Sequence, residues 1–392
     1  MGRLRTLDDL DVAGRRVLLR VDFNVPVEDG RIVDDARIRE SLPTFRKLLA
    51  GGAAVVVATH RGRPAGAVVE DLRVAPLASR LQELLGVTVK VAPGVVGDAV
   101  SGAALALRPG EVLMLENLRF EPGEETNDPA FAKQLAALAD VYVNDAFGAA
   151  HRAHASTEGV AHLLHSAAGL LMEREVEVLG RVLASPREPL VAIIGGAKIS
   201  SKIGVMEHLL PRVEKMLVGG AMACTLLRAQ GAAVGSSKVE EDQLETARRL
   251  LADAGEKIVL PVDAVAADAF SESAAQQVVD SNRIPEGWMM LDVGPRTVAE
   301  FSRVVSAAGT VVWNGPLGVY EMEPFRHGTE GVARAVAASD ALSVVGGGDL
   351  GAALSTLGLE DRITHVSTGG GATLEFLEGR ELPGIKALED KQ

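Results

Sequence analysis

The segment ALSVVGGGDLG, residues 341–351, passes from apolar residues directly into glycines and a single carboxylate. Residues 341–345 predict a short buried strand, and residues 351–357 predict the start of a helix. Glycines at such a junction let backbone N–H groups approach a ligand closely, and the helix dipole there favours phosphate. Asp349 would repel a phosphate unless a divalent cation lay between them. The segment therefore indicates a site for a nucleotide phosphate with Mg²⁺.

The same glycines allow a second interpretation. Gly346, Gly348 and Gly351 match the G-x-G-x-x-G pattern of dinucleotide-binding proteins. That pattern also needs an acidic residue at the end of the next strand, where it holds a ribose hydroxyl. The next predicted strand, ITHVS, ends instead in Ser367, Thr368 and more glycines. A dinucleotide-dependent dehydrogenase is therefore the less favoured interpretation.

Length and composition limit the class of protein. A chain of 392 residues suggests two domains. No apolar run reaches the length of a membrane span, and the first residues, MGRLRTLDDL, lack a signal-peptide core. A single cysteine excludes an intramolecular disulfide framework, and a net charge of −13 argues against nucleic-acid or anionic-membrane surfaces. We therefore expect a cytoplasmic protein that acts on small molecules and has no nucleic-acid or membrane partner.

Strand-like and helix-like segments alternate along the whole chain. Runs such as VLLRV, VVVATH, LVAII and TVVWNG are typical of strands, and IRESLPTFRKLLAGG, APLASRLQELLG and ETARRLLADAG are typical of helices that end at glycine. This alternation predicts the α/β class, with parallel sheets covered by helices on both faces. Residues 172–189, MEREVEVLGRVLASPREP, predict one charged helix and the boundary between two lobes.

In the first lobe, basic and polar residues follow the predicted strands. They are Arg20, Asp22, Asn24, Arg37, His60, Arg61, Arg63, Arg119, His151 and Arg152. Ligands of open α/β sheets bind beyond the carboxyl ends of the strands, and converging arginines recognise phosphate and carboxylate groups. One such arginine alone is best explained as a surface residue, but this many at strand ends indicates a site for a small polyanion.

In the second lobe, GGAKISSK at residues 195–202 follows a predicted strand. Lys198 and Lys202 are four residues apart, so we expect both ammonium groups on one face of a helix near its N-terminus. Such a pair is unfavourable there unless an anion joins it, although two solvated lysines explain the spacing equally well. WNGPLGVYE adds Asn314 and Glu321, and Glu321 is either a ribose ligand or a surface carboxylate. The chain has no G-x-x-x-x-G-K-[ST] motif, which excludes a P-loop kinase.

Ten motifs together make the chain resemble the phosphoglycerate kinase family over almost its whole length. In order they are RVDFNVP, DDARIRESLPT, HRGRP, LENLRFEPGEE, YVNDAFGAAHRAHAST, GGAKIS, LVGGAMA, WNGPLGVYE, SVVGGGD and THVSTGGGATLEFLEG. The resemblance implies two Rossmann-like lobes joined by an interdomain helix and hinge. Residues 1–171 would form the 3-phosphoglycerate-binding domain, 172–188 the helix and linker, and 189–375 the nucleotide-binding domain. Residues 376–392 would return to the first domain.

The resemblance also implies the reaction and the ligands. The reaction would be reversible phosphoryl transfer between 1,3-bisphosphoglycerate and ADP, giving 3-phosphoglycerate and ATP, with Mg²⁺ as cofactor and closure about the hinge. The residues implied to bind the glycerate substrate are Asp22, Phe23, Asn24, Arg37, His60, Arg61, Gly62, Arg63, Arg119 and Arg152. The residues implied to bind the nucleotide are Gly195, Gly196, Ala197, Lys198, Lys202, Gly219, Gly220, Asn314, Pro316, Glu321, Gly347, Gly348, Asp349 and Leu350. Arg37, Lys198 and Lys202 would be catalytic, and Asp349 would hold the metal.

Several residues depart from the family's usual pattern. Leu350 stands where Ser or Thr is common, so we expect Leu350→Ser to tighten nucleotide binding by adding a hydroxyl donor. Met290, Ser201 and Cys224 also replace frequent Gly, Asp and Asn, which bears on nucleotide affinity or preference. The alternative function is a non-catalytic nucleotide-binding scaffold of the same fold. The retained charges Arg37, Lys198, Lys202 and Asp349 favour the enzyme, and the family resemblance implies a monomer.

Overall fold

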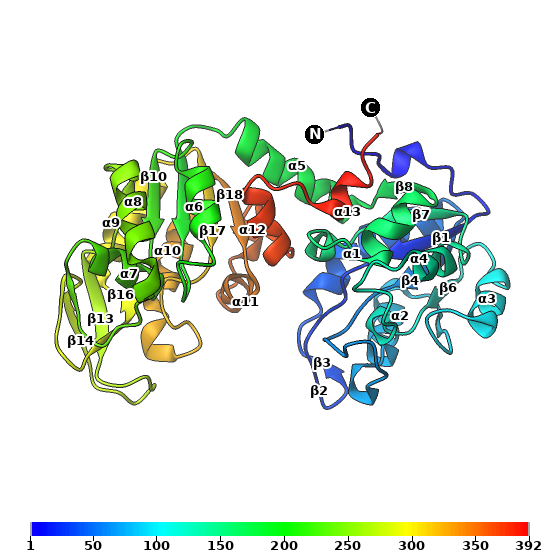
Figure 1. Ribbon diagram of the computed structural model, residues 1–392, viewed down its shortest axis with the longest axis horizontal. Coiled ribbons are helices and arrows are strands. Elements are labelled where there is room, and N and C mark those ends of the chain that lie inside the picture. The colour runs from blue at the N-terminus through cyan, green and yellow to red at the C-terminus, as the bar shows by residue number, and fades with distance from the viewer. Residues whose placement is uncertain (1, 391–392) are drawn as a thin grey trace. The chain divides into compact units, whose positions relative to one another are not determined.

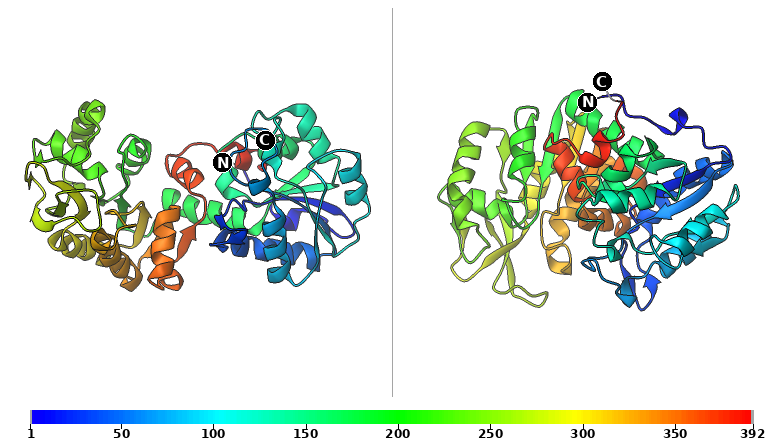
Figure 2. Two further views of the ribbon diagram at one scale, coloured as in Figure 1. Left: turned by 90° about the horizontal axis from the view of Figure 1, so that it is seen from below. Right: turned by 45° about the vertical axis from the view of Figure 1, so that its right-hand side comes forward.

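The computed structural model describes residues 2–390 and contains two compact units (Figure 1). The first unit comprises the chain up to Glu177 together with the segment that begins at Glu381, and the second is Val178–Arg380. The division falls inside helix α5 (Leu170–Ala184). The first and last described residues of the chain lie side by side (Figure 2), and the Gly2 N–H donates to the Glu389 carboxylate over 2.9 Å.

The first unit is built on a six-stranded parallel sheet. Its strand order is β5 (Val89–Val91), β6 (Val112–Met114), β4 (Ala54–Ala58), β1 (Arg16–Arg20), β7 (Val141–Asn144) and β8 (His165–Ala168). Its helices are α1 (Ala36–Ala50), α2 (Ala75–Leu85), α3 (Asp98–Leu105), α4 (Pro129–Ala136), the start of α5 and α13 (Pro383–Lys386). A short hairpin pairs β2 (Val27–Glu28) with β3 (Arg31–Ile32).

The second unit is also built on a six-stranded parallel sheet, but its strands are connected in a different order. The order of its six parallel strands is β12 (Ile258–Val259), β10 (Lys215–Val218), β9 (Leu190–Ile194), β17 (Thr310–Asn314), β18 (Leu342–Gly346) and β19 (His365–Ser367). Its helices are α6 (Ile203–Leu209), α7 (Met222–Ala229), α8 (Leu244–Ala254), α9 (Pro295–Ser306), α10 (His327–Ala338), α11 (Gly348–Thr356) and α12 (Gly371–Leu377). The predicted class, two α/β lobes with parallel sheets, is confirmed.

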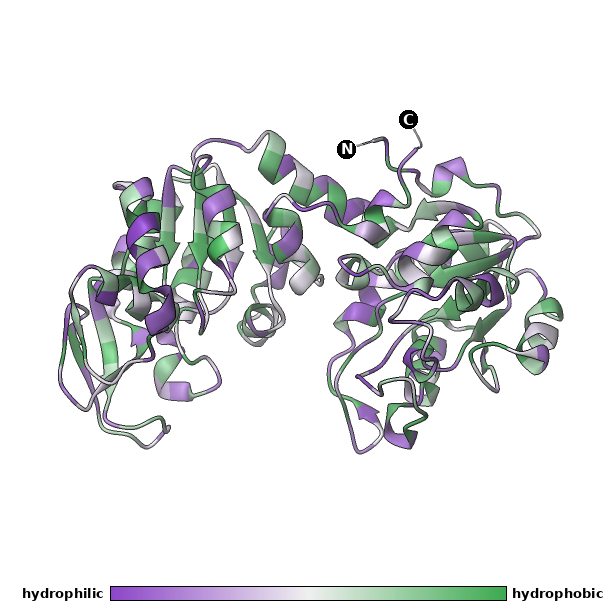
Figure 3. Cartoon of the chain, viewed as in Figure 1, coloured by the Kyte–Doolittle hydropathy of each residue, from purple (hydrophilic) through white to green (hydrophobic). Residues whose placement is uncertain are grey.

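The sequence explains why these segments form strands and helices. The central strands are continuous apolar runs because helices cover both sheet faces; every residue of β4 is buried. Hydropathy colouring shows this contrast between apolar strands and helices of mixed character (Figure 3). Helices α1 and α2 end at the predicted glycines, and the C-cap Gly86 adopts a left-handed φ of 71°.

The sequence prediction missed part of the second unit. Strands β14 (Gln276–Asp280), β13 (Asp263–Ala267) and β16 (Met289–Val293) form an antiparallel sheet, and β11 (Ala233–Val234) pairs with β15 (Arg283–Ile284). Strand β14 is largely exposed and β13 is rich in alanine, so neither has the apolar run by which the other strands were identified. These strands add an antiparallel part to the predicted parallel sheets.

Two local predictions are also corrected. Helix α11 begins at Gly348, three residues before the predicted start, because Gly347 turns the chain with a φ of 114° directly after β18. Asp349 and Leu350 therefore belong to the first helical turn. Helix α6 begins only at Ile203, with Lys202 as its N-cap and Lys198 in the preceding loop. The two lysines do not share a helical face.

Candidate functional site

In the first unit, the loops after β1 and β4 and the first turn of α1 are joined by polar contacts. Nη1 of Arg37 donates to Oδ2 of Asp22 over 2.9 Å and lies 3.4 Å from the Asn24 carbonyl oxygen. Oδ1 of Asn24 accepts the Gly62 N–H at 2.9 Å. These contacts bring a guanidinium, a carboxylate and an amide together at the carboxyl ends of two neighbouring strands. The structure thus holds Arg37 in place before any ligand binds.

His60 is neutral in this arrangement. It is 5% exposed, and Nη2 of the buried Arg20 lies 3.1 Å from its Nδ1. Because a guanidinium only donates, Nδ1 must accept and cannot carry a proton. Burial lowers the pKa of His60 well below its usual value of 6.5, and Arg20 and Arg119 add to the effect against the opposing charge of Asp22. His60 can therefore offer an Nε2–H donor but no positive charge at neutral pH.

Three further arginines follow the strands of this sheet. Arg119 is 5% exposed; its Nη1 donates to the Gly62 carbonyl at 2.7 Å, and its Nε lies 3.2 Å from Glu125. Arg152 is half-buried and donates to the His151 ring at 3.1 Å. Arg63 is exposed and makes no hydrogen bond or ion pair within residues 2–390. We call Asp22, Asn24, Arg37, His60, Arg63, Arg119 and Arg152 the basic cluster.

Two residues of the predicted set are used elsewhere. The Phe23 ring is fully buried and stacks on Phe45, with ring centroids 6.2 Å apart. The Arg61 side chain is 8% exposed, and its Nη1 donates to the Arg73 carbonyl at 3.0 Å. The backbone of both residues is also engaged within the protein, because the Phe23 N–H donates to the Thr59 hydroxyl at 3.0 Å and the Arg61 N–H donates to Oδ1 of Asn117 at 3.1 Å.

In the second unit, the corresponding strand ends are packed backbone against backbone. A Cβ atom at Gly195 would lie 2.1 Å from the carbonyl oxygen of Pro316, and one at Gly315 would lie 2.4 Å from that of Gly195. A Cβ atom at Gly220 would lie 2.6 Å from the carbonyl oxygen of Gly196. Real Cβ atoms do not approach this closely, so only glycine fits at these positions. We call Gly195, Gly220 and Gly315 the glycine wall.

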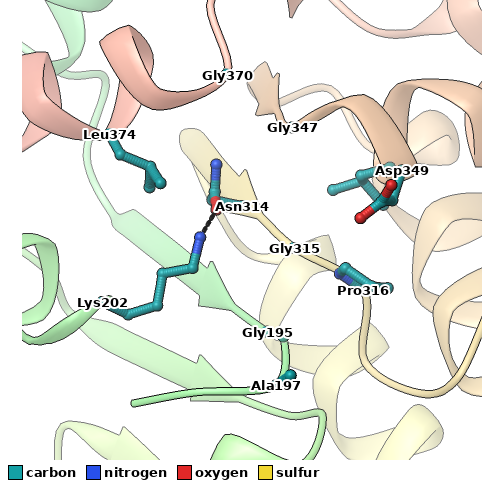
Figure 4. A pocket seen from close by; sticks show the side chains of 12 residues that line it. Gly195, Ala197, Lys202, Asn314, Gly315, Pro316, Gly347, Asp349, Gly370 and Leu374 are labelled. Atoms are coloured by element: carbon teal, nitrogen blue, oxygen red, sulfur yellow. Dashed lines mark hydrogen bonds between the residues drawn. The ribbon is translucent and has the colours of Figure 1, made fainter. Parts of the chain in front are cut away.

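Beside the glycine wall lies a pocket of about 230 Å³, the Lys202 pocket (Figure 4). It is lined by Gly195, Gly196, Ala197, Lys202, Asn314, Gly315, Pro316, Gly347, Asp349, Leu350, Gly370 and Leu374. The Lys202 ammonium donates to Oδ1 of Asn314, whose amide in turn donates to the Gly346 carbonyl at 2.9 Å. Burial lowers the pKa of Lys202 to about 8, although Asp349 and Glu378 oppose the shift. A bound anion would favour its charged form.

Lys198 and Asp349 are the uncommitted charges of this region. Both side chains are exposed, and neither makes a hydrogen bond or ion pair among the residues that the structure describes. Asp349 lines the Lys202 pocket and also a second pocket of about 420 Å³, the Glu321 pocket. The Leu350 side chain, in contrast, is fully buried in the core of the unit, so only its backbone faces the pocket. The structure does not support the expected gain from Leu350→Ser.

The Glu321 pocket combines apolar walls with few charges. Its lining is Gly196, Ala197, Gly220, Ala221, Ser236, Lys238, Phe270, Met289, Met290, Leu291, Pro316, Gly318, Val319, Glu321 and Asp349. Such a surface suits a flat apolar group, and the exposed Glu321 carboxylate can accept hydrogen bonds from hydroxyl groups. Met290 packs beneath it, 4% exposed, with its sulfur 3.7 Å from that of Cys224.

Sequence reasoning missed several lining residues for a physical reason. Phe270, Met289 and Leu291 lie on or beside the unpredicted antiparallel sheet. Gly370 and Leu374 close the Lys202 pocket from the start of α12, and the glycine-rich run after ITHVS was the available signal. Three of the predicted nucleotide residues, Lys198, Gly219 and Gly348, line neither pocket; a Cβ atom added at Gly348 would meet no atom within 4 Å.

The donors for a metal ion are limited. Within residues 2–390, no group of three or more His, Cys, Asp or Glu side chains could hold a metal by itself. One free carboxylate, Asp349, between two pockets nevertheless fits Mg²⁺, which proteins commonly bind through one or two carboxylates together with substrate phosphates. In the same part of the chain, no helix is long and apolar enough to cross a membrane.

Comparisons with known proteins agree with this picture. A family model described as phosphoglycerate kinase matches residues 7–380. A phosphoglycerate kinase of Moorella thermoacetica is 57% identical over 389 residues, covering 98% of this chain and 99% of that protein. One from Pelotomaculum thermopropionicum is 52% identical over 390 residues, covering 99% of each. The solved phosphoglycerate kinase of Coxiella burnetii is 42% identical, with a TM-score of 0.87 over 98% of this chain and 99% of that one. That of Pyrococcus horikoshii is 36% identical, with a TM-score of 0.89 over 98% of each. The chain therefore belongs to the phosphoglycerate kinase family.

Proposed function

We propose that this chain catalyses reversible phosphoryl transfer between 1,3-bisphosphoglycerate and ADP, giving 3-phosphoglycerate and ATP in glycolysis and gluconeogenesis. Family membership supports the reaction class. In each unit, we call the edge of the sheet at the carboxyl ends of its strands the ligand edge. The observation that carries the proposal is the difference between the two ligand edges. The first edge carries the basic cluster, which suits a small polyanion, and the second joins the Lys202 pocket to the Glu321 pocket, which suits a nucleotide.

The basic cluster would bind the glycerate substrate. Arg119, Arg152 and Arg63 can face its phosphate, since guanidinium groups pair with phosphate in a bidentate manner. His60 and Asn24 can meet its carboxylate or hydroxyl by hydrogen bonds without adding charge. Arg37 lies at the edge of this cluster, half-buried and held by Asp22, where it can face the group that is transferred.

The second edge would bind the nucleotide. The Lys202 pocket, with the N–H groups at the start of α11, would hold the phosphates, and the Glu321 pocket would hold adenine and ribose. Asp349 would hold Mg²⁺ between the pockets. When bound, Mg²⁺ supplies positive charge that neutralises the nucleotide phosphates.

The proposed chemistry requires no general base at either edge. The nucleophile is the carboxylate of 3-phosphoglycerate, which is ionised at neutral pH, so no proton has to be removed. The protein's task is to align donor and acceptor and to stabilise the charge on the moving phosphoryl group. Arg37, Lys198 and Lys202 supply that charge. Because the substrates bind to separate domains, the proposal includes closure about the hinge, which would also keep water from the acyl phosphate.

A coupled assay of ATP formation tests the proposal directly. With 1,3-bisphosphoglycerate and ADP, the chain should form ATP, and chelation of Mg²⁺ should abolish the activity. A protein that binds Mg-ADP without forming ATP would instead be the non-catalytic scaffold. Activity that requires NAD would indicate the dehydrogenase. We also propose that the protein is cytoplasmic and that it is a monomer. Size-exclusion chromatography tests the oligomeric state.

A further inference from the structure

The segment from Leu317 to Thr329 forms one wall of the Glu321 pocket. It carries Val319 and Glu321 into the pocket and returns to its own starting point, as an Ω-loop does. The Leu317 N–H donates to the Thr329 hydroxyl at 2.9 Å and closes the loop. The Val319 N–H donates to the Leu291 carbonyl on β16 at 2.8 Å. We call residues 317–329 the ribose-side loop.

The carboxylate of Asp292, on β16, is wedged between the two ends of this loop. Its Oδ2 accepts the Gly328 N–H at 2.7 Å, and its Oδ1 accepts the Val293 N–H at 2.9 Å. A Cβ atom at Gly318 would lie 2.2 Å from Oδ1, and one at Gly328 would lie 2.3 Å from it. Both ends of the loop therefore need glycine because the carboxylate occupies the space of a side chain.

Keeping the Asp292 carboxylate ionised at this buried position is unfavourable. Asp292 is fully buried, and burial raises its pKa to about 7, with a further contribution from Glu330 on α10. The two N–H donors oppose the shift. Glu330 itself is paired with Nε of Arg326 at 2.9 Å and lies 3.9 Å from His327. The residue that pairs with Asp292 on the neighbouring strand β13 is Val265, which is apolar.

Contacts with the start of helix α10 stabilise the ionised Asp292 carboxylate. Gly328 lies in the first turn of that helix, whose N-cap, Arg326, provides no side-chain acceptor. Asp292 supplies the acceptor from a different element, and the helix dipole there favours a negative charge. One carboxylate thus fixes the helix, the loop and the strand that carries Leu291 into the pocket.

We infer that Asp292 is a positioning residue for nucleotide binding: it holds the ribose-side loop so that Val319 and Glu321 form the wall of the Glu321 pocket. The inference rests on the proposed function, because it assigns the Glu321 pocket to the nucleotide. Asp292 touches neither the pocket surface nor any reacting group. Its loss should therefore weaken nucleotide binding without slowing phosphoryl transfer on the saturated enzyme.

Asp292→Asn is the central test, because the amide keeps the shape but can accept only one of the two hydrogen bonds. Asp263→Asn is its matched control. Asp263 is a buried aspartate on the neighbouring strand β13; it accepts the Thr297 N–H at 2.8 Å and the Arg296 N–H at 3.0 Å at the start of α9, and it lines neither pocket. Losing a hydrogen bond to a charged group should raise the calorimetric Kd of Mg-ADP about tenfold in Asp292→Asn. The kcat at saturating ADP and the KM for 1,3-bisphosphoglycerate should change less than twofold. Asp263→Asn should leave the Kd of Mg-ADP unchanged at a similar loss of Tm.

Equal Kd values for Mg-ADP in the two variants would overturn the inference, as would a fall in kcat with unchanged ADP affinity. Should Asp292→Asn fail to fold, Gly328→Ala displaces the loop from the opposite side and must raise the Kd of Mg-ADP for the inference to stand. Failure of the proposed function looks different. In that case the unaltered chain itself would neither form ATP nor bind Mg-ADP.

Discussion

The two ligand edges would both bind anions, but they differ in the groups that they offer for binding. The first edge uses charged side chains: Arg37, Arg119 and Arg152 project from loops that follow parallel strands. The second edge uses backbone, because the glycine wall lets neighbouring loops touch. Each pocket beside that wall has one lysine in its lining, Lys202 in the Lys202 pocket and Lys238 in the Glu321 pocket. In a site made of side chains, several charged groups share the binding of the anion. A backbone site depends on the absence of side chains, which makes it sensitive to single methyl groups.

Removal of the guanidinium at position 37 should give the largest effect. Arg37→Ala should lower kcat roughly 10²–10³-fold, as loss of one group that stabilises transition-state charge commonly does, and leave the Kd of Mg-ADP unchanged. Steady-state kinetics with calorimetry measure both. Arg39→Ala is the matched control, because Arg39 lies on the same helix and pairs with Asp35 outside the basic cluster. Loss of ADP affinity with kcat retained would contradict the role assigned to Arg37.

Leu350→Ser should act on the core of the second unit. Its side chain is fully buried among apolar residues, so replacement by a small polar one should lower the free energy of unfolding by about 2–5 kcal/mol. Denaturant unfolding measures this change, and calorimetry should show no tighter binding of Mg-ADP. Tighter binding would mean that the hydroxyl reaches the phosphates after all.

Two alanine substitutions separate the structural glycines from the ligand-facing ones. Gly195→Ala should destabilise the protein by about 1–3 kcal/mol, because its methyl group would overlap the Pro316 carbonyl. Gly348→Ala should leave stability unchanged or slightly raised, since its Cβ would meet no atom within 4 Å and alanine favours a helix. Yet Gly348→Ala should weaken Mg-ADP binding several-fold if phosphate approaches the start of α11. Unchanged affinity in this stable variant would remove the phosphate from that position.

The smallest expected effect is the uptake of less than one proton when Mg-ADP binds. Because the pKa of Lys202 is about 8, this side chain is mainly neutral at pH 8.5, and a bound phosphate favours its charged form. Mg-ADP binding at pH 8.5 should therefore take up about half a proton or more. Calorimetry in two buffers with different enthalpies of ionisation measures the uptake. Lys202→Met should abolish it, and uptake that persists in this variant would assign the proton to another group.

The fold was predictable from sequence where one signal dominated. Buried strands such as β4 and β9 are unbroken apolar runs, and no other local structure competes with them. The antiparallel strands escaped prediction because β14 is exposed and β13 consists of small residues, whose strand conformation is imposed by pairing. The start of α11 was placed late because the three glycines at 346–348 do not show which of them ends the strand.

The candidate site was predictable at the level of residue types. Charged residues after strands identify the basic cluster because parallel strands bring their carboxyl ends to one edge. What a side chain does there depends on contacts distant in sequence, which no local pattern encodes. Arg61 and Arg63 are two residues apart, yet one donates to the Arg73 carbonyl and the other is free within the described chain. Asp292 likewise carries no motif of its own; its partner Gly328 lies 36 positions away.

The first unit is discontinuous in sequence, since the whole second unit stands between its residues up to 177 and the segment from 381. That segment is not an appendage: the Arg5 N–H donates to the Leu388 carbonyl at 3.0 Å, and the Gly384 N–H donates to the Ala150 carbonyl at 2.9 Å. During synthesis, the second unit is therefore complete before the first can be closed, although the first begins to emerge earlier. The first unit therefore gains its last contacts, those of the segment from 381, only after every residue of the second unit has been synthesised.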